Sequence, residues 1–245
     1  MKLSEINPSE NLKVLLSGAP GSGKTCTALG FPYPILVLAF EPKVSSAAAW
    51  YAGDKERLEN VDVRPLWQNL DSGDPVEDLM NIISKELIPQ QKAGVMKYKT
   101  LVIDSMSTFS NALLLHIVKT NGGIKRPVSK QGMQPCQMDY GILKREFHKL
   151  IPGILSLPMN VVMLAHIKTD RSELTGEILR IPYLDGSYGE KLAEVFDESY
   201  FIFMKDGKPF ARSKSDQDYK FCRSQIPGLP EVFEISYANL TKKWK

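Results

Sequence analysis

Cysteine is scarce in this chain of 245 residues, and the three that occur, Cys26, Cys136 and Cys222, lie far apart. They form no CxxC pair, which argues against a disulfide framework and against a cysteine-based zinc site. A reducing compartment, the cytoplasm, is the natural setting for a chain that uses cysteine in this way.

Long apolar runs are also missing. No stretch approaches 18 consecutive apolar residues, so we expect no membrane-spanning helix. The first ten residues, MKLSEINPSE, lack the apolar segment of a secretory signal. The net charge is only +3, so any nucleic acid would have to be bound by local basic patches rather than by a field from the whole surface.

Internal repeats and low-complexity tracts are absent, and 43% of the residues are apolar, enough to bury one sizeable core. We expect a single domain over 1–245, with a core of about 12–204 and closing strands or a β-hairpin region over 205–245. Short apolar strands alternate with helical patterns, which predicts an α/β fold with a mainly parallel sheet covered by helices on both faces. The expected strands are 12–17, 34–40, 61–66, 100–103 and 160–165, and the expected helices are 24–30, 45–52, 75–89, 107–119 and 137–157. Loops are expected at 120–135 and 167–189.

A glycine-rich segment, GAPGSGKT, joins the first expected strand to the first expected helix and matches the pattern GxxxxGK[ST]. Glycines let the backbone curl so that several N–H groups converge on a polyphosphate, and the helix N-terminus adds partial positive charge there. Lys24 is expected to reach the β- and γ-phosphates, and Thr25 to offer its hydroxyl to Mg²⁺. The expected nucleotide-binding residues are Gly18, Ala19, Pro20, Gly21, Ser22, Gly23, Lys24, Thr25 and Cys26.

Polar side chains follow three of the apolar strands. Asp104 ends the strand TLVID and is expected to join Thr25 at the metal, but the next residue is Ser105 rather than a glutamate that could act as a base. Glu41 follows the strand PILVLAF at the sheet edge where ligands bind, and it is the predicted base for water. His166 closes the strand NVVMLA and is the predicted sensor of the γ-phosphate.

The order of these segments, GAPGSGKT, FEP, LVIDS and VVMLAH, resembles that of the RecA-like ATPases. Within them the chain is most similar to the compact phage-encoded Sak-type RecA-core proteins, which act in single-strand annealing and recombination. The resemblance covers about 12–203. It implies a RecA-like P-loop NTPase fold in which Glu41 activates water, with Lys24 and His166 completing the catalytic set. Full-length RecA has large terminal extensions that are not found here, so strand exchange without other proteins is not expected.

The resemblance also implies ligands and partners. ATP and Mg²⁺ are the expected cofactors, and hydrolysis is expected to be stimulated by single-stranded DNA. Copies of the chain are expected to assemble into a ring or filament, and a single-strand-binding protein is a candidate partner. If the chain is phage-encoded, the host cytoplasm is its expected location.

In such a core, the loop after the Asp104 helix and the loop after the sensor strand face DNA. The first carries Lys125, Arg126 and Lys130, and the second carries Lys168 and Arg171. Cations in glycine-containing loops can follow a phosphate backbone and release its counterions. Aromatic residues are not interleaved with them, so base-specific readout is not predicted.

Three further cations, Arg212, Lys214 and Arg223, lie on and after the expected C-terminal hairpin. In RecA-like assemblies such a position can reach the γ-phosphate held by the next subunit and stabilise the charge of phosphoryl transfer. Solvated surface charge explains them equally well, and the sequence does not choose among the three.

Two other functions remain open from the sequence. A small-molecule kinase is suggested by GAPGSGK, but Lys24 is followed directly by Thr25 and no arginine-dense lid is visible. A nucleotide switch that loads or remodels a DNA-replication partner would require Glu41 to be catalytically idle.

Overall fold

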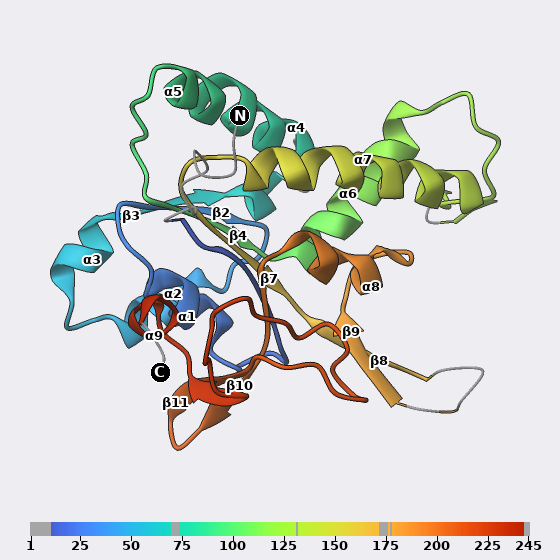
Figure 1. The fold of residues 1–245 in the computed structure, drawn as a ribbon. Helices are drawn as coiled ribbons and strands as arrows, with labels where there is room; N and C mark the ends of the chain where they lie inside the picture. The colour runs from blue at the N-terminus through green and yellow to red at the C-terminus, as the bar shows by residue number, and fades with distance from the viewer. Residues whose placement is uncertain (1–10, 70–73, 131, 172–175, 177, 243–245) are drawn as a thin grey trace, which may run out of the picture.

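The computed structural model describes residues 11–69, 74–130, 132–171, 176 and 178–242. Its centre is a large β-sheet (Figure 1). The sheet has eight strands in the order β12-β11-β10-β1-β7-β4-β2-β3. Neighbouring strands are parallel from β10 to β3, and β11 and β12 add an antiparallel edge beside β10. The strands of this sheet are β1 Lys13–Ser17, β2 Ile35–Ala39, β3 Val61–Pro65, β4 Thr100–Asp104, β7 Asn160–Ala165, β10 Glu198–Lys205, β11 Lys208–Arg212 and β12 Val232–Glu234.

Helices cover both faces of the sheet (Figure 1). On one face α1, α2 and α9 pack on the strands through residues such as Leu29, Ala47 and Leu240. On the other face α4, α6, α7 and α8 pack around Phe109 and Phe147. The helices are α1 Lys24–Leu29, α2 Val44–Trp50, α3 Lys55–Glu59, α4 Pro75–Asn81, α5 Ile88–Lys92, α6 Met106–Thr120, α7 Gln137–Leu155, α8 Tyr188–Leu192 and α9 Tyr237–Thr241. Among the described residues, none of these helices combines the length and apolarity that crossing a membrane requires.

Strands β2, β4 and β7 are buried along their whole length, and β1 is buried from its second residue. Successive side chains enter opposite cores: Leu15 lies on the α6 and α7 side, whereas Val14 and Leu16 lie on the α1 side. A parallel strand buried on both faces needs apolar residues at every position rather than at alternate ones. This requirement explains why the apolar runs predicted these strands.

The strand register brings the ends of four strands to one edge of the sheet. Ser17 at the end of β1 pairs with Ala165 at the end of β7, and Asp104 at the end of β4 pairs with Ala39 at the end of β2. The segments that follow β1, β2, β4 and β7 therefore begin side by side. These are the segments that carry the glycine loop and the predicted carboxylates.

Two expected loops contain secondary structure. The region 120–135 holds a small hairpin of β5 Val128–Ser129 and β6 Gly132–Met133, and the region 167–189 holds β8 Ile167–Arg171, β9 Ile178–Pro182 and α8. The sequence predicted a loop at 120–135 and a loop-rich stretch at 167–189, and this prediction missed both hairpins because they are mostly exposed or half-buried and carry no apolar alternation.

Two helical predictions also need correction. Helix α3 was not predicted, because its five residues, KERLE, include no buried side chain that would mark an apolar face. The helical stretch that begins at Pro75 was expected to end at Pro89, but it runs through α4, a π-helical segment Ile82–Leu87 and α5 to Lys92. Pro89 is the second residue of α5 and does not end the stretch.

Candidate active site

The glycine loop lies between β1 and α1, and two of its glycines are required by the space and the backbone. A Cβ at Gly18 would lie 2.5 Å from the carbonyl oxygen of Ile202 and 2.6 Å from Ser22 Oγ, closer than any side chain allows. Gly23 has φ of +85°, and a Cβ there would also press on Met204 and Pro209 at 3.1 and 3.2 Å. The loop is thus curled tightly against β10 and β11.

Lys24 is folded back into this loop. Its Nζ donates to the carbonyl oxygens of Gly18 and Ala19, both at 2.9 Å, and only 7% of the residue is exposed. Burial lowers the pKa of the Lys24 ammonium to about 8, and the negative charges of Asp104 and Glu41 oppose that shift. Ser22 Oγ is buried without a hydrogen-bond partner among the described residues. A buried ammonium held by neutral carbonyls, beside an unpartnered hydroxyl, fits the phosphates of a nucleotide.

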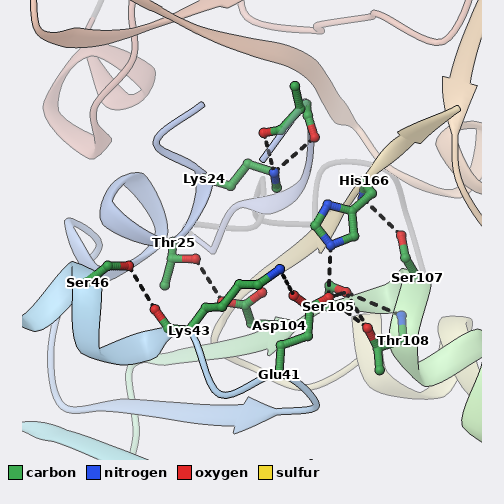
Figure 2. A network of polar contacts seen from close by, with 12 residues as sticks. Lys24, Thr25, Glu41, Lys43, Ser46, Asp104, Ser105, Ser107, Thr108 and His166 are labelled. Carbon is green, nitrogen blue, oxygen red and sulfur yellow. Dashed lines mark hydrogen bonds and ion pairs between the residues drawn. The ribbon is translucent and has the colours of Figure 1, made fainter. Parts of the chain in front are cut away.

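The predicted metal ligands are in direct contact. Thr25, at the start of α1, donates its hydroxyl to Asp104 Oδ2 at 2.8 Å (Figure 2). Asp104 is 6% exposed, and burial raises the pKa of its carboxyl, with the Thr25 hydrogen bond acting against that rise. A hydroxyl and a desolvated carboxylate at the end of a strand are a donor set that fits Mg²⁺.

Glu41 follows the end of β2 by two residues, and its carboxylate is held by four donors. Oε1 accepts from the hydroxyls of Ser105 at 2.5 Å and Thr108 at 2.7 Å, and it lies 2.9 Å from His166 Nε2 (Figure 2). Oε2 lies 3.1 Å from Lys43 Nζ. The hydrogen bond from His166, joined by those from Ser105, Thr108 and Lys43, holds the pKa of Glu41 well below its usual range, although burial acts in the opposite direction.

His166 follows β7 and contacts the predicted base directly. Its backbone N–H donates to Ser107 Oγ at 2.9 Å, which fixes the residue to the first turn of α6. An ionised carboxylate can only accept, so Nε2 carries the proton that faces Glu41. Nδ1 is buried and has no hydrogen-bond partner among the described residues. The role of His166 as a phosphate sensor stays a prediction, but its position couples it to Glu41.

A cavity of about 300 Å³ lies beside the glycine loop. Its walls include the predicted loop residues 20–26 together with Glu41, Asp104 and His166. The sequence prediction missed four residues that also line it, namely Lys43, Ser46, Trp50 and Met204. The closeness of Lys43 to Glu41 in the sequence was an available signal, whereas Met204 enters only through the pairing of β10 with β1.

One predicted DNA contact, Arg126, is wrong. Its side chain is fully buried and forms a bidentate pair with Asp139, with Nη2–Oδ1 at 2.6 Å and Nε–Oδ2 at 2.9 Å. Its Nη1 donates to the carbonyl oxygen of Asn121 at 2.7 Å. A guanidinium that is buried and neutralised in this way cannot follow a phosphate backbone. The neighbouring cations Lys125 and Lys130 are exposed.

The other predicted DNA contacts lie on the β8–β9 hairpin. Lys168 is half-buried with Nζ 3.5 Å from Asp170 Oδ2, and exposed Arg171 donates to the carbonyl oxygen of Gly176 at 3.1 Å. The hairpin starts at Ile167, directly after His166. Lys168 is therefore two residues along the chain from His166, whose side chain contacts Glu41.

The three cations predicted to act on a neighbouring subunit do not line the cavity of their own chain. Arg212 is held by Asp216 at 2.7 Å and by Glu231 at 2.9 Å. Arg223 pairs with Ser199, which is level with Leu15 in the middle of β1 and so lies away from the glycine loop. Lys214 is exposed after β11. The role of all three stays a prediction, and Arg212 would have to leave two carboxylates before it could reach a neighbour.

Comparison with known proteins agrees with this geometry. A protein-family model described as an AAA domain matches residues 10–222, a range that contains every residue lining the cavity. No curated protein matches the chain. The α/β P-loop NTPase fold expected from the sequence is confirmed by the mainly parallel sheet and by this match. The chain therefore belongs to the AAA domain family of P-loop, ATPase-type proteins.

Proposed function

We propose that this protein hydrolyses ATP in a Mg²⁺-dependent reaction and that Glu41 is the base. The observation that carries the proposal is the placement of Glu41 on the wall of the cavity that also contains Lys24, Thr25 and Asp104. Bound Mg²⁺ would neutralise phosphate charge and orient the triphosphate. Thr25 and Asp104 would hold that ion, and the loop N–H groups with Lys24 would bind the phosphates. Glu41 would accept a proton from water at its carboxylate.

The proposal includes single-stranded DNA as a ligand and a role in annealing or recombination, as the Sak-type resemblance implies. Exposed Lys125 and Lys130 support it, because the buried Arg126–Asp139 pair fixes the loop that carries them. The β8–β9 hairpin supports it as well. A strand of DNA that shifts Lys168 would also shift His166, two residues away, and thereby the hydrogen bond on Glu41. This link is a physical route to DNA-stimulated hydrolysis.

Assembly into a ring or filament is part of the same proposal. A neighbouring copy would supply one of the cations Arg212, Lys214 or Arg223 to the cavity, and a single-strand-binding protein remains a candidate partner. Because the cavity of one chain contains none of these three side chains, a cation from a second copy would add a positive charge to those of Lys24 and Lys43.

The test is steady-state ATP hydrolysis with and without oligothymidylate, with Lys24→Ala as the blank. We expect turnover in the wild type that rises with DNA. The double variant Lys125→Ala/Lys130→Ala should bind DNA more weakly. The slope of the logarithm of its binding constant against the logarithm of the salt concentration should be smaller in magnitude by about 1 for each phosphate that is no longer neutralised. Lys92→Ala, which removes an exposed cation on α5, is the matched control. Turnover that stays unchanged at saturating DNA would remove the DNA role and leave the ATPase.

A nucleotide switch that loads or remodels a partner is the second candidate function, and one observation favours it. The four donors on Glu41 hold the pKa of its carboxyl low, which makes it a weak base in this conformation. A switch would bind Mg·ATP tightly and turn it over no faster than Lys24→Ala, with or without DNA. Measuring ATP affinity and turnover on the same preparation separates the two functions.

A further inference from the structure

The donors around Glu41 are distributed unevenly between its two oxygens. Oε1 contacts Ser105, Thr108 and His166, whereas Oε2 contacts only Lys43 among the described residues. Ser105 and Thr108 do not line the cavity, whereas Lys43 does and its side chain is 63% exposed, so Oε1 faces the start of α6 and Oε2 faces the open side. We infer that Ser105 and Thr108 are positioning residues that clamp Oε1 and thereby present Oε2 to water. This inference rests on the proposed role of Glu41 as the base.

The two hydroxyls are placed by the start of α6. Ser105 is the N-cap of the helix, and its Oγ accepts the backbone N–H of Thr108 at 3.3 Å. The cap brings the two hydroxyl oxygens within 3.2 Å of each other, on the side facing Glu41 (Figure 2). Each hydroxyl has a single proton to donate, and Glu41 Oε1 is the nearest acceptor of both, at 2.5 and 2.7 Å. The carboxylate is therefore held by two short bonds from one helical turn.

The clamp fixes the anion without neutralising it. Hydroxyl donors carry no formal charge, so Ser105 and Thr108 hold Oε1 without placing a cation on it, in contrast to the arginine of a bidentate ion pair. Ser105 directly follows the predicted metal ligand Asp104, so one segment of five residues, Asp104 to Thr108, would hold both the ion and the base. This arrangement gives a function to the serine that stands where a second acidic residue could have followed Asp104.

The alternative is that Ser105 and Thr108 only stabilise the start of α6. Thr108→Val tests it, because valine keeps the shape of threonine and removes the hydroxyl. We expect kcat to fall at least about tenfold, since small displacements of a catalytic group carry large rate losses. The affinity for Mg·ATP, measured by titration with a fluorescent ATP analogue, should change by less than about twofold because Glu41 is not a phosphate ligand. Thr108→Ser, which restores the hydroxyl, should restore kcat.

Ser110→Ala is the matched control on the same helix. Ser110 is buried, and its Oγ accepts the backbone N–H of Asp185 at 2.8 Å, so the variant removes one hydroxyl from α6 without touching Glu41. Its kcat should match the wild type even where its melting temperature falls. Ser105→Ala should repeat the kcat loss of Thr108→Val and serves as the second variant if valine disturbs folding. An equal kcat loss in Ser110→Ala would mean that α6 stability is responsible, and would overturn the inference.

A double-mutant cycle with Glu41→Gln completes the test. If Thr108 acts only through Glu41, Thr108→Val should cost nothing further in the Glu41→Gln background, in single-turnover hydrolysis of radiolabelled ATP. Losses that multiply would overturn the clamp, and so would a Thr108→Val enzyme that turns over at the wild-type rate. The absence of turnover in the wild type would overturn the proposed ATPase and the clamp with it. Wild-type turnover with an unaffected Thr108→Val enzyme would overturn the clamp alone.

Discussion

Two buried carboxylates in this protein, Asp139 and Glu41, are satisfied in opposite ways. Asp139 accepts from two nitrogens, Nε and Nη2, of a fully buried guanidinium and also from the backbone N–H of Cys136 at 2.8 Å, so its charge is balanced inside the protein. Glu41 receives two neutral hydroxyls, a histidine and a lysine whose side chain is 63% exposed. The first carboxylate stabilises a loop at the start of α7, and the second keeps a charge at the edge of a cavity.

This contrast distinguishes the two carboxylates, which their positions in the sequence do not. Glu41 follows the apolar strand PILVLAF, and Asp139 follows the loop that was expected to contact DNA. Arg126, the partner of Asp139, was one of the expected DNA contacts. The difference lies in the compensation: a buried bidentate arginine balances the charge of Asp139, whereas the hydroxyl donors on Glu41 carry no charge and its lysine partner is mostly exposed. The following predictions test that difference, from the largest expected effect to the smallest.

The largest effect is expected from neutralising each carboxylate in turn. Glu41→Gln should lower kcat by roughly 10²- to 10⁴-fold and retain ATP binding, because it removes the proton acceptor and keeps the shape. Asp139→Asn should leave kcat within about twofold and lower the melting temperature instead. Hydrolysis assays and thermal melts on both variants measure the contrast. Equal activity losses in the two variants would contradict it.

Arg126→Ala should be the next largest, as a loss of stability. It leaves Asp139 buried without its cation, and we expect the melting temperature to fall by roughly 10 °C. Lys125→Ala, one residue away and exposed, should shift it by no more than about 2 °C. Thermal unfolding followed by circular dichroism gives both values. A small shift for Arg126→Ala would mean that the pair contributes little to the fold.

Acid should weaken the same pair. Arg126 lowers the pKa of Asp139 to about 2 in the folded chain, below the unperturbed value of about 4. A group with a depressed folded pKa stabilises the protein above its unfolded pKa and loses that contribution as pH falls towards the folded value. The stability advantage of the wild type over Asp139→Asn should therefore shrink between about pH 4 and pH 2. Urea unfolding at several pH values measures it, and a constant difference would argue against the linkage.

The smallest effect is expected at Lys43. Its side chain is mostly exposed, which weakens the ion pair with Glu41, so Lys43→Ala should raise kcat by less than about threefold, because Oε2 then has no competing donor. Lys43→Arg, which keeps the cation, should behave like the wild type. A fall in kcat with Lys43→Ala would indicate that this lysine contributes to the reaction rather than opposing it.

Much of the site could be predicted from the sequence because its parts are short and local. The glycine loop is one continuous segment, and Glu41, Asp104 and His166 each stand at or just after the end of an apolar strand. The alternation of strands and helices fixed their meeting at one sheet edge. The hairpins β5–β6 and β8–β9 could not be predicted in the same way, because exposed polar strands carry no apolar period.

The amino-acid sequence by itself therefore determined the phosphate loop, the core strands and the residues at their ends. Only the tertiary structure decided which donors those residues meet. Glu41 contacts Ser105, 64 residues away, and His166, 125 residues away, while Arg126 meets Asp139 and is shielded from solvent. The physical reason is that the curl of the glycine loop and the apolar character of each core strand are set by residues close together in the sequence. The compensation of a buried charge depends instead on side chains that only the folded sheet and its helices bring together.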